Sequence, residues 1–305
     1  MKPTTEERTL AVIAHLSALA FGAGLVIPAL LWSENHRNPA AVQGKSNYVR
    51  FQTLQALGYQ SLGYTIWLLL ILLLVVLLYM VLFLIALFVP NAAQNQPITL
   101  GISVVLLVGL FGLMGIYLII PVVGAVLCGL GQDFRYPVLG GRLARFLRYE
   151  ISDPGASLDS AAEERFAASM GHFAVIIPLW GLLAPAYLWI SQRKNSAFLR
   201  FQSAQTTLYQ IFVNLLYFGL TFLAIALGLA AMFLFASFMD LGEWTAVAGM
   251  MVMICLLGLA GMIIPIFHIL GQWAGLRVLQ GNNFRYPLIA RLVERWINKD
   301  IKESA

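Results

Sequence analysis

The stretch NYVRFQTLQALGYQ, Asn47–Gln60, decides the fold because a close copy of it, FLRFQSAQTTLYQ, returns at Phe198–Gln210. A second phrase, FRYP, stands at Phe134–Pro137 and again at Phe284–Pro287. Both pairs are offset by the same 150 residues, and each polar phrase lies beside a long apolar stretch. Self-similarity at a fixed period indicates an internally duplicated chain.

The duplication extends toward the N-terminus of each half. His15 aligns with His172, Pro28 with Pro185 and Trp32 with Trp189, at an offset of 157 because the first loop of the second half is seven residues shorter. We therefore predict a first membrane repeat at residues 1–149, an acidic flexible linker at 150–164 and a second membrane repeat at 165–305.

Composition places most of the chain in lipid. Hydrophobic residues make up 60% of it and charged residues 11%, whereas a soluble domain has about 25% charged residues. A helix needs about 20 apolar residues to cross a bilayer. We predict an all-α, polytopic membrane bundle with about three membrane segments in each repeat, from the apolar stretches 9–32, 58–89, 98–131, 168–190, 208–239 and 245–271.

The charges of the chain indicate its surroundings. There are 19 Lys and Arg against 14 Asp and Glu, and the basic residues flank apolar stretches, so the expected partner is a bilayer with anionic headgroups and not nucleic acid.

Cys128 and Cys255 lie inside apolar runs, so no disulfide, metal site or cofactor is expected. The N-terminal segment does not resemble a cleavable signal. We expect a multi-pass protein of the bacterial cytoplasmic (inner) membrane with both termini cytoplasmic.

Two topologies compete. If every apolar stretch spans the membrane, the second repeat is inverted and the Lys and Arg residues divide 11 to 8, almost without the usual bias toward one side. If the first stretch of each repeat is re-entrant, all 19 lie on one side. We favour the re-entrant topology and keep the inverted repeat, common in transporters, as the alternative. The residues that would break the helices are Gly22, Gly24, Pro28, Pro178, Gly181 and Pro185.

The glutamines of the repeated phrase are the costly residues near lipid, because a carboxamide there needs partners. They either bond neighbouring helices or line a polar cavity. His15 and His172, about two turns into their apolar stretches, either bond a neighbouring helix or relay protons, although no Asp or Glu lies in any apolar stretch. The glutamine candidates are Gln52, Gln55, Gln60, Gln202, Gln205 and Gln210.

Each FRYP phrase is followed by an amphipathic pattern typical of a helix that lies on a membrane surface. We expect the basic and tyrosine residues of the two phrases to contact lipid headgroups or a docking partner. These residues are Arg50, Arg200, Arg135, Arg285, Tyr136 and Tyr286.

The order of these motifs resembles a bacterial membrane family of unknown function, numbered forty-eight-seventy, here as a tandem copy. That family is similar to the twenty-kilodalton subunit of the chloroplast inner-envelope (Tic) protein translocon. The resemblance is carried by His15, Pro28, Arg50, Phe51, Gln52, Gln55, Ala56 and 134–137, and by His172, Pro185, Arg200, Phe201, Gln202, Gln205 and 284–287. It implies a channel or scaffold for polypeptides at a membrane.

We predict a non-enzymatic membrane protein, a scaffold or translocation-related component that grips another membrane protein or a second copy of itself. The alternative is a transporter or channel for a small neutral or amphipathic solute, with a cavity lined by Gln52, Gln55, Gln202 and Gln205. No Ser/His, paired Asp or HExxH arrangement supports an enzyme, so no catalytic residue is assigned.

Overall fold

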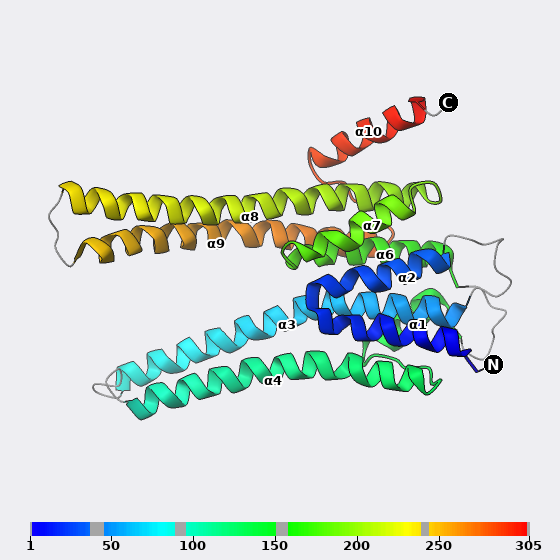
Figure 1. Ribbon diagram of the computed structural model, residues 1–305, viewed down its shortest axis with the longest axis horizontal. Coiled ribbons are helices and arrows are strands. Elements are labelled where there is room, and N and C mark those ends of the chain that lie inside the picture. The colour runs from blue at the N-terminus through cyan, green and yellow to red at the C-terminus, as the bar shows by residue number, and fades with distance from the viewer. Residues whose placement is uncertain (1, 37–45, 89–95, 151–157, 239–243, 304–305) are drawn as a thin grey trace. The chain divides into compact units, whose positions relative to one another are not determined.

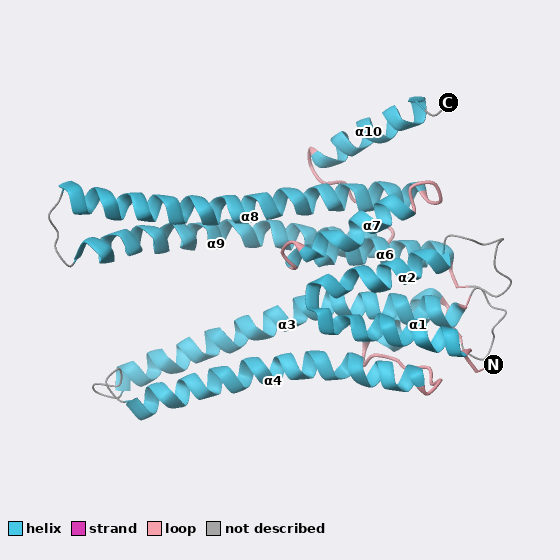
Figure 2. Ribbon diagram, in the orientation of Figure 1, coloured by secondary structure: helices cyan, strands magenta, loops and turns pink. Residues whose placement is uncertain are grey.

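The computed structural model describes residues 2–36, 46–88, 96–150, 158–238 and 244–303. These residues form helices and contain no strand (Figure 2). The chain divides into two compact units, Met1–Met170 and Gly171–Ala305. The prediction of an all-α polytopic membrane bundle is confirmed. Each unit is described by itself.

Unit 1 begins with a helical hairpin. Helix α1 (Thr5–Leu16) starts with a capping box between Thr4 and Glu7, and the 3-10 helix η1 (Ser17–Leu25) leads into α2 (Val26–His36). Within η1, Phe21 has φ 50° and ψ −138°, and α2 folds back along α1 there (Figure 1). The long helices α3 (Asn47–Phe88) and α4 (Gln96–Gly129) follow, and then α5 (Leu139–Leu147).

Unit 2 repeats this order, which confirms the internal duplication. Helix α6 (Ser160–Phe173) enters it, with the unit boundary after Met170. The chain turns at Leu179, where φ is 61°, between η3 (Ala174–Ile176) and η4 (Trp180–Leu182). Helix α7 (Leu183–Ser191) returns, and α8 (Ala197–Phe238), α9 (Trp244–Leu279) and α10 (Ile289–Glu303) complete the unit.

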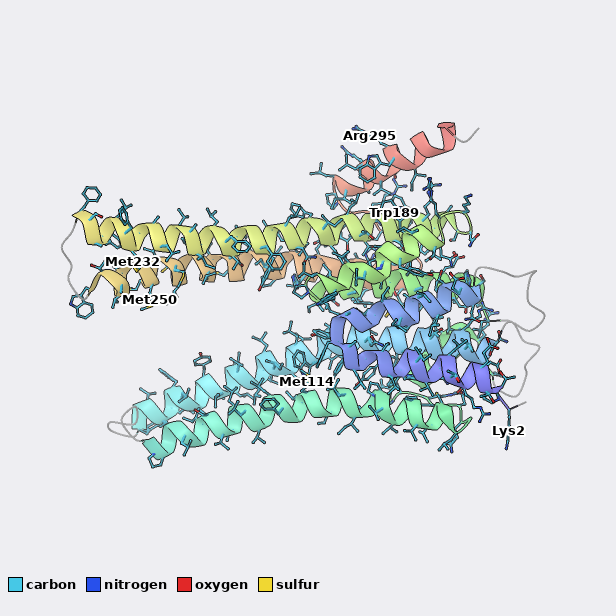
Figure 3. All side chains as sticks on the ribbon, in the orientation of Figure 1. Lys2, Met114, Trp189, Met232, Met250 and Arg295 are labelled. Atoms are coloured by element: carbon cyan, nitrogen blue, oxygen red, sulfur yellow. The ribbon has the colours of Figure 1, made fainter. Side chains whose placement is uncertain are left out.

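Each unit has a packed end and an apolar end. The first turns of α3 and α8, which contain the repeated phrase, are buried, whereas their later turns and the facing parts of α4 and α9 expose large apolar side chains such as Phe83 and Phe233. Figure 3 shows such side chains projecting outward along α8 and α9. Apolar surface of this extent requires lipid.

Five helical stretches among the described residues are long and apolar enough to cross a membrane. The first of them contains the break at Phe21. They are Thr5–His36, Asn47–Ile85, Leu100–Gly129, Ala197–Phe238 and Trp244–Leu279.

The expected linker at 150–164 is only partly described, because 151–157 lie outside the described residues. Its last residues differ from the expectation of a flexible segment. Ser160–Glu164 form the start of α6, and Glu163 is fully buried there. A buried carboxylate needs a partner of opposite charge, and Glu163 pairs with Arg50 of the same unit.

Candidate functional site

The hairpin, the RFQ phrase and the FRYP phrase meet in a buried polar cluster in each unit. In unit 1, His15 Nε2 lies 3.0 Å from Gln52 Oε1, and His15 Nδ1 lies 2.8 Å from the Tyr136 hydroxyl. The carboxamide oxygen of Gln52 can only accept, so His15 Nε2 donates to it and Nδ1 accepts from Tyr136.

The glutamines of α3 bond the backbone of the FRYP turn. Gln52 Nε2 donates to the Phe134 carbonyl (3.1 Å) and to Asp133 Oδ1 (3.1 Å). Gln55 Nε2 donates to the same carbonyl (3.0 Å), and Gln55 Oε1 accepts from the Tyr136 amide (2.8 Å). Two phrases are thus joined by bonds from side chain to backbone between residues 79 to 82 positions apart in sequence.

Unit 2 builds the same cluster from the second copy. His172 bonds the Tyr286 hydroxyl (2.9 Å) and Gln202 Oε1 (3.1 Å). Gln205 donates to the Phe284 carbonyl (2.8 Å) and accepts from the Tyr286 amide (3.2 Å). We call this shared set of histidine, two glutamines, tyrosine and turn backbone the His–Gln–Tyr lock.

Stacked tyrosines close one side of each lock. Tyr59 stacks on Tyr136 with ring centroids 4.2 Å apart, and Tyr209 on Tyr286 at 3.9 Å. The hydroxyls of Tyr59 and Tyr209 donate to the carbonyls of α4 and α9 at Tyr117 and Phe267. The lock therefore reaches the second long helix of each unit.

The third glutamine of each phrase holds the hairpin. Gln60 Nε2 donates to Ser17 Oγ (2.9 Å), and Gln210 Nε2 donates to the Gly171 carbonyl (2.8 Å). The glutamine candidates are all buried. The structure thus brings them together with both candidate histidines in bonds between helices.

Burial governs the electrostatics of the lock. It lowers the pKa of His172 to about 4, although the hydrogen bond to Gln202 opposes the shift. Burial also raises the pKa of Tyr286 well above its usual value. Both groups are therefore neutral at pH 7, as hydrogen bonding in a buried site requires.

Three residues expected at headgroups or a docking partner lie elsewhere. Tyr136 and Tyr286 are buried in the locks. Arg50 is only 7% exposed and makes a bidentate ion pair with Glu163, with Arg50 Nε 2.9 Å from Glu163 Oε1. The expectation for Arg50 and the tyrosines was wrong, because each side chain finds a partner inside its unit.

The remaining arginines are nearer the surface. Arg135 pairs with Asp133 at 3.1 Å, and the more exposed Arg285 pairs with Glu294 at 2.7 Å. Arg200 is half-buried. No residue was assigned to catalysis or metal binding, and among the described residues no three His, Cys, Asp or Glu side chains lie together as a metal site.

Sequence reasoning missed three participants. Glu163 was assigned to the linker, and neither Asp133 nor Thr206 was singled out. The Thr206 hydroxyl lies 3.0 Å from His172 Nδ1. Only Asp133 had a visible signal, since it directly precedes FRYP and its equivalent Asn283 also bonds the first glutamine, at 2.6 Å.

These features define a polytopic helical membrane protein made of two tandem repeats. A family model for the magnetosome magnetite crystal formation protein family matches residues 6–144 and again residues 163–293, and the chain belongs to that family. The match supports a membrane-type family in tandem copy and supplies no evidence for the translocon resemblance. Neither the curated proteins nor the solved structures contain a match to the chain.

Proposed function

We propose that the chain is a non-enzymatic membrane scaffold whose two units lie on the same side of the bilayer. Helices α1 and α2 have 12 and 11 residues, so each is about 18 Å long or less at 1.5 Å per residue. That is short of the roughly 30 Å of hydrocarbon in a bilayer. In this proposal the α1–α2 and α6–α7 hairpins are re-entrant, and only the α3–α4 and α8–α9 pairs cross.

Two crossings per unit return the chain to the side from which it started. All 19 Lys and Arg residues then lie on one side, since none stands between α3 and α4 or between α8 and α9. The positive-inside rule makes that side cytoplasmic in a bacterial inner membrane. The first prediction to test is therefore the orientation of the units.

The single observation that supports the scaffold role is that the glutamines form hydrogen bonds inside the fold. A solute pathway needs polar groups that face an open cavity, whereas Gln52, Gln55, Gln202 and Gln205 are fully buried and bond the FRYP turns. This supports a rigid packed end that presents a surface to other membrane components. Within its family, such a role would be to organise the membrane in which a magnetite crystal forms.

The test combines topology with flux. Single cysteines at Thr4, Phe88, Lys194 and Trp244 are labelled from each side of the membrane in a Cys255→Ala background. We expect Thr4 and Lys194 to label from the cytoplasm and the other two from outside. An inverted repeat would also place Thr4 and Lys194 together, but it would move Phe88 to their side and leave only Trp244 opposite. Labelling of Thr4 and Phe88 from the same side would therefore overturn the proposed orientation.

The flux arm separates a scaffold from a transporter. Proteoliposomes containing the full chain are assayed for swelling in glycerol, urea and sucrose, beside protein-free liposomes. We expect equal rates. A solute flux that is lost in the Gln55→Leu, Gln205→Leu double variant, with insertion intact, would replace the scaffold by the transporter.

A further inference from the structure

Helices α1 and α6 are repeat equivalents that differ in burial. The sequence Glu-Glu-Arg occurs at residues 6–8 of α1 and at 163–165 of α6. At the positions of Glu6, Thr9 and Ile13, α1 is exposed, with Ile13 44% exposed. At the equivalent positions, Glu163, Phe166 and Met170, α6 is buried, with Met170 0% exposed.

The buried face of α6, at residues 163–170, belongs to unit 1 and packs there on a defined surface of α3 and α5. Glu163 pairs with Arg50, the Phe166 ring lies against Gly58, and the Phe146 ring of α5 lies 6.5 Å from the Phe166 ring between centroids. A Cβ added at Gly58 would come 2.6 Å from Phe166 Cζ. The contact is therefore close as well as charged.

The equivalent surface of unit 2 is open. By the repeat offset of 150, Arg50 corresponds to Arg200, Gly58 to Leu208 and Phe146 to Trp296. Trp296 is 50% exposed, and Ile211, one turn beyond Leu208, is 40% exposed although its equivalent Ser61 is fully buried. Helix α10 packs on α8 beside this surface (Figure 1).

We propose that two copies of the chain associate head to tail, with the outer face of α1 (Glu6, Thr9, Ile13) of one copy on the α8–α10 surface (Leu208, Ile211, Trp296) of the next. The contact reproduces the one that α6 makes in unit 1. The two faces are different, so the interface is heterologous, and it produces a ring if the rotation closes and a filament if it does not. The proposal goes beyond the scaffold role and stands independently of it.

Chemistry and charge agree with this occupant. The α1 outer face presents the Glu6 carboxylate, the Thr9 hydroxyl and the apolar Ile13, and the α8–α10 surface presents the exposed Ile211 and Trp296 beside the basic start of α8. The contact would cover Ile13, Ile211 and Trp296, and large apolar residues at the centre of an interface contribute most to affinity. Lipid is the competing cover for these side chains.

The test is crosslinking in the membrane between two differently tagged full-length copies, both with Cys255→Ala and with the buried Cys128 retained. One copy carries Thr9→Cys and the other Ile211→Cys. We expect a disulfide between the two tags at least about tenfold above the pair in which exposed Arg142→Cys replaces Thr9→Cys, as a specific contact requires. Leu208→Cys in place of Ile211→Cys is a second pair that should behave in the same way.

A charge placed in the interface provides an independent readout. Thr9 is exposed, so Thr9→Arg should leave unit 1 folded, but it would bring a cation toward the basic start of α8. We expect it to weaken self-association in detergent by at least about tenfold, measured by mass photometry, while Arg142→Glu has no such effect. Two results would overturn the proposal. The first is disulfides that form only between two Thr9→Cys or two Ile211→Cys positions. The second is a protein that stays monomeric at every concentration and gives no crosslink, in which case lipid covers these faces.

Discussion

Gln55→Met should loosen unit 1, although the new side chain is unbranched and of similar length. The substitution removes the acceptor of the Tyr136 amide (2.8 Å) and a donor to the Phe134 carbonyl (3.0 Å). The carbonyl keeps its bond from Gln52 (3.1 Å), but the buried amide loses its partner. A buried unpaired donor together with lost hydrogen bonds costs about 2–4 kcal/mol.

Cys128 reports this loss through its reactivity. Its side chain is fully buried in the cluster formed with Ala11, Tyr48 and Val49, so a bulky maleimide reaches it only when unit 1 opens. In a Cys255→Ser background, 2–4 kcal/mol corresponds to labelling that is roughly 30- to 1,000-fold faster than in the parent, when opening and closing are rapid.

The duplication supplies the matched control for this experiment. Gln205→Met removes the equivalent bonds from unit 2, and Cys128 should then label at the parental rate if the units open independently. Labelling of the Gln55→Met variant at the parental rate would refute the reasoning, because the lock would then contribute nothing to the stability of unit 1.

Three further predictions follow from the same geometry. Glu163→Gln should destabilise unit 1 by about 3–5 kcal/mol, because it leaves Arg50 buried without its counter-charge; Cys128 labelling measures it, and an unchanged rate would contradict the ion pair. Gly24→Ala should prevent the hairpin turn, because the added Cβ would meet the Ser17 carbonyl oxygen, whereas Gly112→Ala meets open space; insertion and protease resistance distinguish the two variants. Unit 2 should lose stability as the pH falls below 6.5 toward 4, by up to about 1.4 kcal/mol per pH unit. The reason is that His172, with its pKa lowered to about 4, stays neutral in the folded state while the unfolded state binds a proton. Thermal unfolding of the parent beside His172→Gln measures this, and identical pH profiles would contradict it.

The fold could largely be predicted from the sequence because its signals are periodic or repeated. Apolar length indicates helices in lipid, and the common offset of RFQ and FRYP indicates two equivalent units. The repeat also showed that these phrases belong to one structural element. It could not show that they touch, because a glutamine that bonds turn backbone leaves no periodic trace in the sequence.

The hairpin turns show a second limit. The sequence places the breaks at glycines and prolines, and the turning residues are Phe21 and Leu179, both with positive φ. Glycine has another task there. Gly24 and Gly181 allow close approach to the carbonyls of Ser17 and Ala174, where a Cβ would collide. The positive φ thus falls on Phe21 and Leu179, and the close approach falls two or three residues later, on Gly24 and Gly181. A large side chain fits at the first position, but only glycine fits at the second.

The two units differ in the residues that surround the locks, and this difference separates what the fold requires from the surface that each unit exposes. In unit 1, Asp133 accepts from Gln52 (3.1 Å), from the Tyr149 hydroxyl (3.2 Å) and from Arg135. In unit 2, the equivalent Asn283 Oδ1 accepts from Gln202 (2.6 Å), and Arg285 pairs with Glu294.

Unit 2 also has a groove of about 350 Å³ lined by Phe198, Phe201 and Arg285, whereas in unit 1 the Tyr149 ring stacks on Phe51 at 4.1 Å between centroids. A lock that is built identically in two different surroundings is a requirement of the fold. A surface that is filled in one unit and open in the other is free to acquire a partner, and variants on these open surfaces should change assembly while the locks keep both units folded.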